Sequence, residues 1–369
     1  MLSRFQRFRI QLGAVLWFTL LLVGLLGLAV VGIWPWWMIG LVIAAGLLLG
    51  SLSYLLRWLS RRGSPDFSPS RTFLTHASGG VLAAIGLAAL PIYYMAHWVS
   101  SGPTSLPLAT LSNGKKTVVF QGMQHVGSED FYKAVVFDLE KALTEGYTLF
   151  YEGVQPVPGR PDLAQWFNET LRGTKKDLSA GYRQLADSCG LTFQLTYFAP
   201  LLADKALHPS RHITADVTYL DMKNEYDRLL KEDPSFARAI AARASKSADG
   251  EDPIVSILVA TSKATRDQKR LVAILCRGVL GLSVAGIVGE KDDPMEKIIL
   301  HFRNRALARF VAQSPAEKIY ITYGAAHFPG FLKDLQALDP AMKVDSLRWV
   351  RPMSLPNEPQ APVGYPVTR

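Results

Sequence analysis

Apolar residues dominate the first hundred positions of the chain, and apolar and polar residues alternate after that. From Ile10 to Leu56 there is no Asp, Glu, Lys or Arg, a run of 47 residues, whereas one membrane-spanning helix needs only about 20. Residues 32–37, Gly-Ile-Trp-Pro-Trp-Trp, supply a proline break and the aromatic residues typical of a membrane–water interface. The pattern predicts two spanning helices, at about 11–31 and 36–56.

A third apolar stretch, from Gly79 to Val99, carries no charge and is long enough to cross a membrane once. A buried helix is the alternative for this stretch. The first apolar run is much longer than the core of a cleaved signal peptide, which holds about 7–15 apolar residues. The sequence therefore predicts a three-helix transmembrane region over residues 1–100, with spans at about 11–31, 36–56 and 79–99.

Charge is distributed unevenly along the chain. Residues 1–100 hold seven Arg and one acid, Asp66, which gives +6 of the formal net charge of +9. These Arg precede the first span or lie between the second and third, and the positive-inside rule places both regions in the cytoplasm. Three crossings then put the C-terminal part on the extracytoplasmic, periplasmic side of the cell (inner) membrane. The basic pI reflects this topology, and no basic–aromatic stripe indicates nucleic-acid binding, so the expected partner is the lipid bilayer.

Strand and helix patterns alternate beyond position 100. Residues 101–115 are rich in Ser, Pro, Gly and Thr, which predicts a linker. Strand patterns at 117–121 and 147–151 flank a helix pattern whose apolar residues recur every four positions. This compact alternation predicts a parallel crossover, and hence an α/β domain over 116–350 with a parallel-sheet core and surrounding helices.

Three features of the C-terminal part leave alternatives open. The stretch from Leu271 to Gly289 is very apolar, which favours a buried core helix, with an interfacial helix on the membrane as the alternative. Cys189 and Cys276 either pair in an oxidising compartment or stay as two buried free thiols. Five prolines after Arg351 predict a flexible tail over 351–369.

A short motif occurs twice, as Gly122-Met123-Gln124-His125 and as Gly324-Ala325-Ala326-His327, and each copy directly follows a strand pattern. Glycine allows a sharp turn at the end of a strand, where α/β proteins place their chemistry. Histidine can bind a metal or move protons near neutral pH. A single histidine after a strand is more often a structural hydrogen-bonding residue, but the repetition favours function. If the two strands lie side by side, His125 and His327 converge on one cleft.

An acid, Glu152, follows the strand pattern at 147–151. If that strand neighbours 117–121, Glu152 lies close to His125. Two histidines and a carboxylate are a usual ligand set for a catalytic divalent metal with an open position for water. Without a metal, Glu or His would act as the general base. A helix cap or a surface acid is the alternative for Glu152.

Arg303 lies on the apolar face of a helix pattern over 295–313, because its neighbours three, four and seven positions away are apolar. An unpaired buried charge is unfavourable, so Arg303 needs an anionic partner. That partner is Glu152, or a substrate carboxylate or oxyanion, and a structural ion pair is the alternative to a catalytic role. Asp216, after a short strand pattern, is a weaker candidate for the same cleft, and Pro209 argues against a metal pair of His208 and His212.

The region from about 116 to 335 resembles the TraB/GumN/TIKI group of the superfamily that includes the erythromycin esterases and ChaN-like proteins. The resemblance rests on the order and spacing of four pieces: Gly122–His125, Tyr151–Gly153, Arg303–Ala308 and Gly324–Gly330. The chain departs from the family pattern at Phe302, where the family has an acid before the Arg-Asn pair, and at Gly153, where it has a second acid.

This resemblance implies a metal-dependent hydrolase of the peptidase or metalloprotease type, acting on peptides or protein ends. By position, the matching catalytic residues are His125, Glu152, Arg303 and His327. Of these, His125, Glu152 and His327 would hold a divalent metal ion, for which Mn, Co and Zn are the candidates. Other members of the group bind peptide or haem without turnover, which gives the alternative of a non-catalytic membrane-tethered binder.

Overall fold

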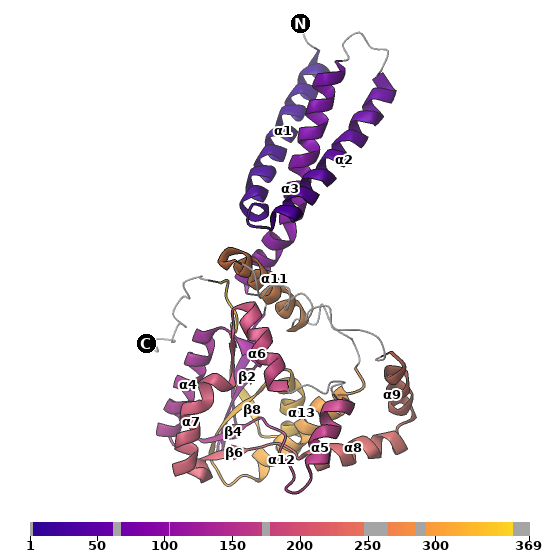
Figure 1. The fold of residues 1–369 in the computed structure, drawn as a ribbon. Coiled ribbons are helices and arrows are strands. Elements are labelled where there is room, and N and C mark those ends of the chain that lie inside the picture. The colour runs from indigo at the N-terminus through magenta and orange to yellow at the C-terminus, as the bar shows by residue number, and fades with distance from the viewer. Residues whose placement is uncertain are drawn as a thin grey trace. The chain divides into compact units, whose positions relative to one another are not determined.

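A computed structural model describes residues 3–61, 68–102, 104–171, 178–246, 265–284 and 293–356. Contacts divide the chain into two compact units (Figure 1). The first comprises Met1–Trp98 with Lys263–Gly278, and the second comprises Val99–Ser262 with Val279–Arg369.

The first unit contains three long apolar helices: α1 (Arg4–Val31), α2 (Trp36–Arg61) and α3 (Pro69–Ser101). All three are long and apolar enough to cross a membrane, which confirms that the N-terminal region has the character of a membrane segment. The helices extend beyond the expected spans at 11–31, 36–56 and 79–99, because helical structure continues into the polar flanks that carry the Arg residues.

Glycines bring α2 and α3 into backbone contact. A Cβ atom added at Gly80 of α3 would overlap the carbonyl oxygen of Gly46 and lie 2.7 Å from the nitrogen of Gly50, both on α2. Close packing of this kind is the usual way in which helices associate in lipid, where no hydrophobic effect drives them together. One polar contact adds to it, between Ser53 Oγ and His76 Nδ1 at 2.9 Å.

Helix α11 (Arg266–Val284) contributes its first part to this unit. Leu271 is buried in a cluster that includes Val31 and Ile85, and the Gln268 side-chain amide donates to the carbonyl of Ile33 at 3.0 Å. The expected helix over 271–289 is thus buried in its first part, but this part packs on the N-terminal helices and not in the sheet domain. Residues 285–289 lie outside the described residues.

The second unit is built on a six-stranded sheet in the order β6-β4-β7-β2-β1-β8. Strands β6, β4, β7 and β2 are parallel neighbours, and β1 is antiparallel to both β2 and β8. A short second sheet pairs β3 with β5. The strands span Leu106–Ser112 (β1), Thr117–Met123 (β2), Val126–Gly127 (β3), Thr148–Tyr151 (β4), Thr192–Phe193 (β5), His212–Thr214 (β6), Lys318–Gly324 (β7) and Lys343–Val350 (β8).

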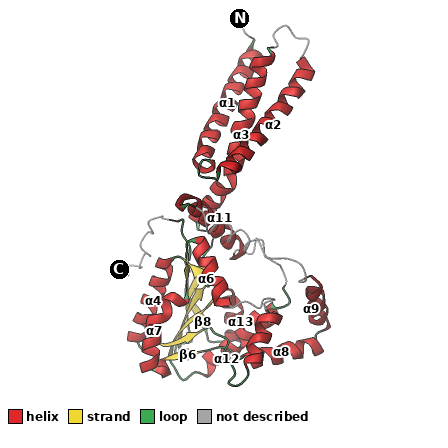
Figure 2. Ribbon diagram, in the orientation of Figure 1, coloured by secondary structure: helices red, strands yellow, loops and turns green. Residues whose placement is uncertain are grey.

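Helices cover both faces of the large sheet, with α4 and α7 on one side and α12 and α13 on the other (Figure 2). Alternate residues of β7 point to the two layers, as a strand requires: Ile321 packs with α12 and α13, and Tyr320 packs with α4. The helices span Glu129–Thr144 (α4), Pro161–Trp166 (α5), Phe167–Leu171 (η1), Leu178–Cys189 (α6), Leu195–Leu207 (α7), Pro209–Arg211 (η2), Tyr219–Glu232 (α8), Pro234–Lys246 (α9), Lys297–Phe302 (η4), Arg303–Gln313 (α12), Ala325–His327 (η5) and Phe328–Leu338 (α13).

This unit confirms the expected α/β class with a mostly parallel sheet, and it corrects two details. The segment 101–115 is not simply a linker, because it contains the buried strand β1 between β2 and β8. Cys189 and Cys276 are both disulfide-bonded, so the alternative of two free thiols is wrong. Of the expected tail, residues 351–356 are described and include the buried Met353, and the remainder lies outside the described residues.

Candidate functional site

Each of the four parallel strands is followed by a polar side chain at the same edge of the sheet. His125 comes after β2, Glu152 after β4, Asp216 after β6 and His327 after β7. The carboxyl ends of parallel strands are where open α/β sheets bind their ligands. The candidate site therefore forms where these four strand ends meet.

The order of the strands decides which of these residues touch. Strands β2 and β7 are directly paired, with Met123 opposite Gly324, so the two GxxH motifs lie side by side as expected. Strand β7 also lies between β2 and β4. Glu152 is consequently next to the second motif, and the condition under which it would lie close to His125, that strands 117–121 and 147–151 are neighbours, is not met.

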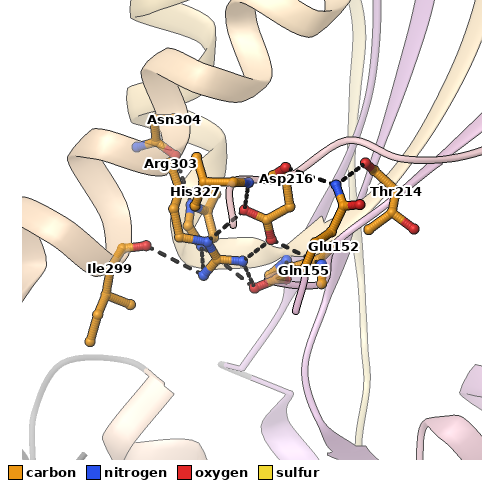
Figure 3. Close-up of polar contacts among 11 residues, drawn as sticks. Glu152, Gln155, Thr214, Asp216, Ile299, Arg303, Asn304 and His327 are labelled. Carbon is orange, nitrogen blue, oxygen red and sulfur yellow. Dashed lines mark hydrogen bonds and ion pairs between the residues drawn. The ribbon is translucent and has the colours of Figure 1, made fainter. Parts of the chain in front are cut away.

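Arg303 is at the centre of the site (Figure 3). Its Nε and Nη2 atoms donate to the two carboxylate oxygens of Asp216 at 3.0 and 2.6 Å, and Nη2 also donates to Glu152 Oε1 at 2.8 Å. The side chain is buried, at 7% exposure. The structure thus supplies the buried anionic partners that the sequence required for this arginine, and Asp216 is the closer of the two.

Asp216 is completely buried and fully hydrogen-bonded. Besides the two bonds from Arg303, its oxygens accept from the backbone N–H groups of Gly153 at 2.9 Å and Val217 at 2.8 Å. Four donors of this kind fix the carboxylate, which in turn fixes the plane of the guanidinium. Asp216 was a weaker candidate from the sequence, although it has the same place after a strand as Glu152.

Glu152 is the more accessible carboxylate of the pair, with 22% of its side chain exposed. Its Oε2 accepts from the N–H of Gly324 at 2.6 Å. Burial acts to raise the pKa of Glu152, but the positive charge of Arg303 and these hydrogen bonds outweigh burial and hold the pKa below its usual value. Glu152 is therefore ionised at neutral pH.

His327 is buried beside this pair. Its Nδ1 lies 2.7 Å from Asn304 Oδ1, an acceptor, so Nδ1 carries the proton and Nε2 has the lone pair. Nε2 lies 3.5 Å from Arg303 Nη1 and 3.8 Å from Glu152 Oε1. Burial, with a further contribution from Arg303, lowers the pKa of His327 to about 4. His327 is thus uncharged at neutral pH.

A glycine three residues after the second motif, Gly330, allows close packing beside His327. A Cβ atom at Gly330 would overlap the side-chain amide of Asn304. Glycine at this position lets Asn304 approach His327 and fix the orientation of its ring. The segments Arg303-Asn304 and Gly324–Gly330 therefore act together: the second contains His327, and the first contains the two residues that contact its ring nitrogens.

His125 has different partners. Its ring lies 4.3 Å from that of Tyr182, and its Nδ1 is 2.9 Å from Gln194 Nε2. The Gln194 amide nitrogen is a donor, so Nδ1 accepts and the proton of the neutral imidazole is on Nε2. The backbone supports the pair, since the N–H of Gln194 donates to the carbonyl of His125 at 3.0 Å.

One cleft connects His125 with Glu152, Arg303 and His327, and all four residues line it. Its volume is about 1120 Å³, slightly above the usual range for ligand pockets of about 300–1,000 Å³. Apolar side chains form much of the wall, among them Phe167, Phe198, Leu201, Tyr219, Ile299 and Trp349. The cleft therefore combines room for an extended ligand with a few converging polar groups.

The residues expected to hold a metal do not present three open ligand atoms in this arrangement. Both Glu152 oxygens accept hydrogen bonds from the protein, and the Arg303 guanidinium lies beside His327 Nε2, where it opposes a second cation. Among the described residues, no group of three or more His, Cys, Asp and Glu side chains is placed to hold a metal ion. The metal requirement stays a prediction, and the chemistry derived below uses the protein's own groups.

Comparisons with known proteins identify no relative: no family model, curated protein or solved structure matches the chain. The similarity to the TraB/GumN/TIKI group therefore stays a prediction from the sequence motifs. The functional argument rests on the geometry of the cleft.

Proposed function

We propose that this chain is a membrane-anchored hydrolase of the peptidase type, which cleaves peptides or protein ends in the cleft. One observation carries the proposal: an ionised Glu152 and an uncharged His327 adjoin Arg303 at the carboxyl edge of the sheet, in a cleft with apolar walls. Titratable groups held in different protonation states, at a place where a ligand has room, are a mark of catalytic sites.

In the proposed reaction Glu152 is the general base. Its carboxylate takes a proton from a water molecule, and the water oxygen attacks the carbonyl carbon of the substrate. A carboxylate with a lowered pKa is a weak base, so the carbonyl has to be strongly polarised. Arg303 provides this, because its Nη1 makes only long contacts, to Ile299 O at 3.4 Å and His327 Nε2 at 3.5 Å, and can donate to a developing oxyanion placed beside it.

His125 completes the reaction on the other side of the cleft. Its Nε2–H can donate a hydrogen bond to the substrate, and the proton that Glu152 took from water passes to the leaving nitrogen as the carbon–nitrogen bond breaks. Asp216 and Asn304 have positioning roles: Asp216 holds Arg303, and Asn304 holds His327. Each proton taken from water is thus accounted for.

The proposal places the cleft on the extracytoplasmic side of the cell membrane. Two observations support this topology. The Arg residues of the N-terminal region flank the helices on the side expected to be cytoplasmic, and both cysteines are disulfide-bonded, as is typical of an oxidising compartment.

A peptide library incubated with the full chain in detergent tests the proposal. Wild type is expected to generate new termini, and His125→Ala and His327→Ala to abolish most of them. Parallel incubations with a chelator and with added Mn, Co or Zn separate a metal-dependent reaction from a metal-free one. The proposal fails if both variants leave every cleavage unchanged.

The alternative is a membrane-tethered protein that binds peptide or haem without turnover. One observation favours it: the charges of Glu152, Asp216 and Arg303 already satisfy one another, as in a structural network. Haem absorbance of the purified chain, or peptide that is bound by the wild type and recovered intact, supports this alternative.

A further inference from the structure

A second chain of polar contacts reaches the same cleft from the opposite face of β4. The hydroxyl of Tyr151 lies 2.8 Å from His212 Nδ1, and His212 Nε2 lies 2.6 Å from Asp204 Oδ2. The rings of Tyr151 and His212 are parallel to within 8°. Tyr151 and Glu152 are consecutive residues at the end of a strand, so their side chains point to opposite faces of the sheet.

The burial of these groups differs in a way that suits proton transfer. The His212 side chain is fully buried, whereas 34% of the Asp204 side chain is exposed. Tyr151 and His212 both line the cleft. The buried His212 therefore contacts the hydroxyl of a tyrosine that is itself one of the residues lining the cleft.

The protonation states follow from the partners. The hydrogen bond from His212 lowers the pKa of Asp204, which is therefore a carboxylate and can only accept. His212 must donate from Nε2, so its Nδ1 has the lone pair and accepts from the hydroxyl of Tyr151. The other Asp204 oxygen, Oδ1, contacts His208 Nδ1 at 3.1 Å, so His208 does not compete with His212 for Oδ2.

We propose that Tyr151, His212 and Asp204 form a second reactive centre of the cleft, in which Tyr151 is a nucleophile toward acyl or sulfonyl electrophiles. The arrangement is that of a hydroxyl nucleophile, a histidine base and an orienting carboxylate.

The step balances without a further reactant. The Tyr151 oxygen forms a bond to the acyl carbon, and the bond from that carbon to its leaving oxygen breaks. The Tyr151 proton moves to His212 Nδ1, where Asp204 stabilises the imidazolium, and then to the leaving oxygen. An ester or another acyl donor with a good leaving group is the matching substrate class, because a phenolate is a modest nucleophile.

This inference does not depend on Glu152. The competing explanation is structural: the same hydrogen bonds tie β4 to β6 and to α7. A structural network would hold the ring of Tyr151 without activating its oxygen, so chemical reactivity separates the two explanations.

An aryl sulfonyl fluoride supplies the test, since transfer of its sulfonyl group to a tyrosine oxygen releases fluoride and leaves a stable adduct. The full chain in detergent is incubated with the probe, and the adducts are located and timed by peptide mass spectrometry. Tyr219 is the internal reference, because it lines the same cleft but packs against Phe167. The expected result is that Tyr151 reacts at least about tenfold faster than Tyr219, since a positioned base contributes about 100-fold or more.

Three variants test whether the reactivity of Tyr151 depends on His212 and Asp204 and not on the overall shape of the cleft. His212→Asn and Asp204→Asn should slow the labelling of Tyr151 about tenfold or more while Tyr219 labels as before, and Glu152→Gln should leave Tyr151 labelling within about twofold. Asp204→Asn acts from a partly exposed position and keeps the side-chain shape. Equal rates at Tyr151 and Tyr219 in wild type, or an unchanged Tyr151 rate in Asp204→Asn, overturn the proposal.

Discussion

Replacing Arg303 by methionine removes the charge at the centre of the site while keeping most of the side-chain volume. The substitution deletes two hydrogen bonds to Asp216 and one to Glu152. Asp216 then keeps only the N–H groups of Gly153 and Val217, in a position where its side chain has no exposure. The variant therefore contains a buried carboxylate without a counter-charge.

The expected loss of stability is large. Removing one partner of a buried ion pair costs about 3–5 kcal/mol, mostly because the remaining charge is uncompensated. Arg305 is a matched control on the same helix. It pairs with Glu225 at 3.1 Å, but 48% of its side chain is exposed, so Arg305→Met should cost about 0–1 kcal/mol.

Hydrogen exchange of the β7 amides measures this difference in the full chain in detergent. These amides lie in the centre of the sheet and exchange when the second unit opens. A loss of about 3 kcal/mol accelerates their exchange about 100-fold or more, since each 1.4 kcal/mol is a factor of ten. Adding Asp216→Asn to Arg303→Met should restore part of the protection. Equal exchange in Arg303→Met and Arg305→Met would refute the argument that Arg303 neutralises a buried charge.

Three further predictions concern pH, helix packing and metal. Burial lowers the pKa of His327 to about 4 in the folded protein, so the unfolded chain binds this proton at a higher pH than the folded chain. The free energy of unfolding should therefore fall by up to about 3 kcal/mol as pH drops from about 6.5 to 4. The change in protection of the β7 amides between pH 7 and pH 5 should be smaller in His327→Gln than in wild type. Gly80→Val should lower the melting temperature of the helical unit, because the new side chain would overlap the backbone of α2. Gly40→Val is the control and should not lower it, since a Cβ atom there meets nothing within 4 Å. Equal melting temperatures of the two variants would contradict the close packing of α2 and α3. For the predicted metal site, wild type incubated with Mn, Co or Zn should retain about one ion per chain, and the folded His125→Ala/His327→Ala double variant none; no metal in either form removes the metal-dependent version.

The sequence identified the parts of the site that depend on local pattern. Each GxxH motif follows a strand and begins with the glycine at which the chain turns, so the positions of His125 and His327 at a strand end were predictable. The apolar neighbours of Arg303 showed that it needs a buried anion, and the structure provides Asp216 and Glu152. These inferences required only the periodicity of single elements.

The misplaced features depend on contacts between distant parts of the chain. Strand β7 inserts between β4 and β2, and no local pattern reports this order, so the sequence could place Glu152 beside His125 only on the condition that their strands were neighbours. Strand β1 was taken for a linker because Ser and Pro obscure its alternation, although it pairs with β8 more than 200 residues later. The apolar α11 was assigned to the sheet domain, since its sequence does not indicate which apolar surface it meets.

Oxygen-18 labelling tests the central claim, hydrolysis in the cleft, most directly. The full chain in detergent is incubated with a peptide library in ¹⁸O-enriched water, and new carboxyl termini are examined by mass spectrometry. Wild type should produce termini that contain one ¹⁸O atom from the attacking water, and Glu152→Gln should lose this product while the surface variant Arg305→Met keeps it. Equal ¹⁸O incorporation by wild type and Glu152→Gln, or intact peptides with wild type, would contradict the account.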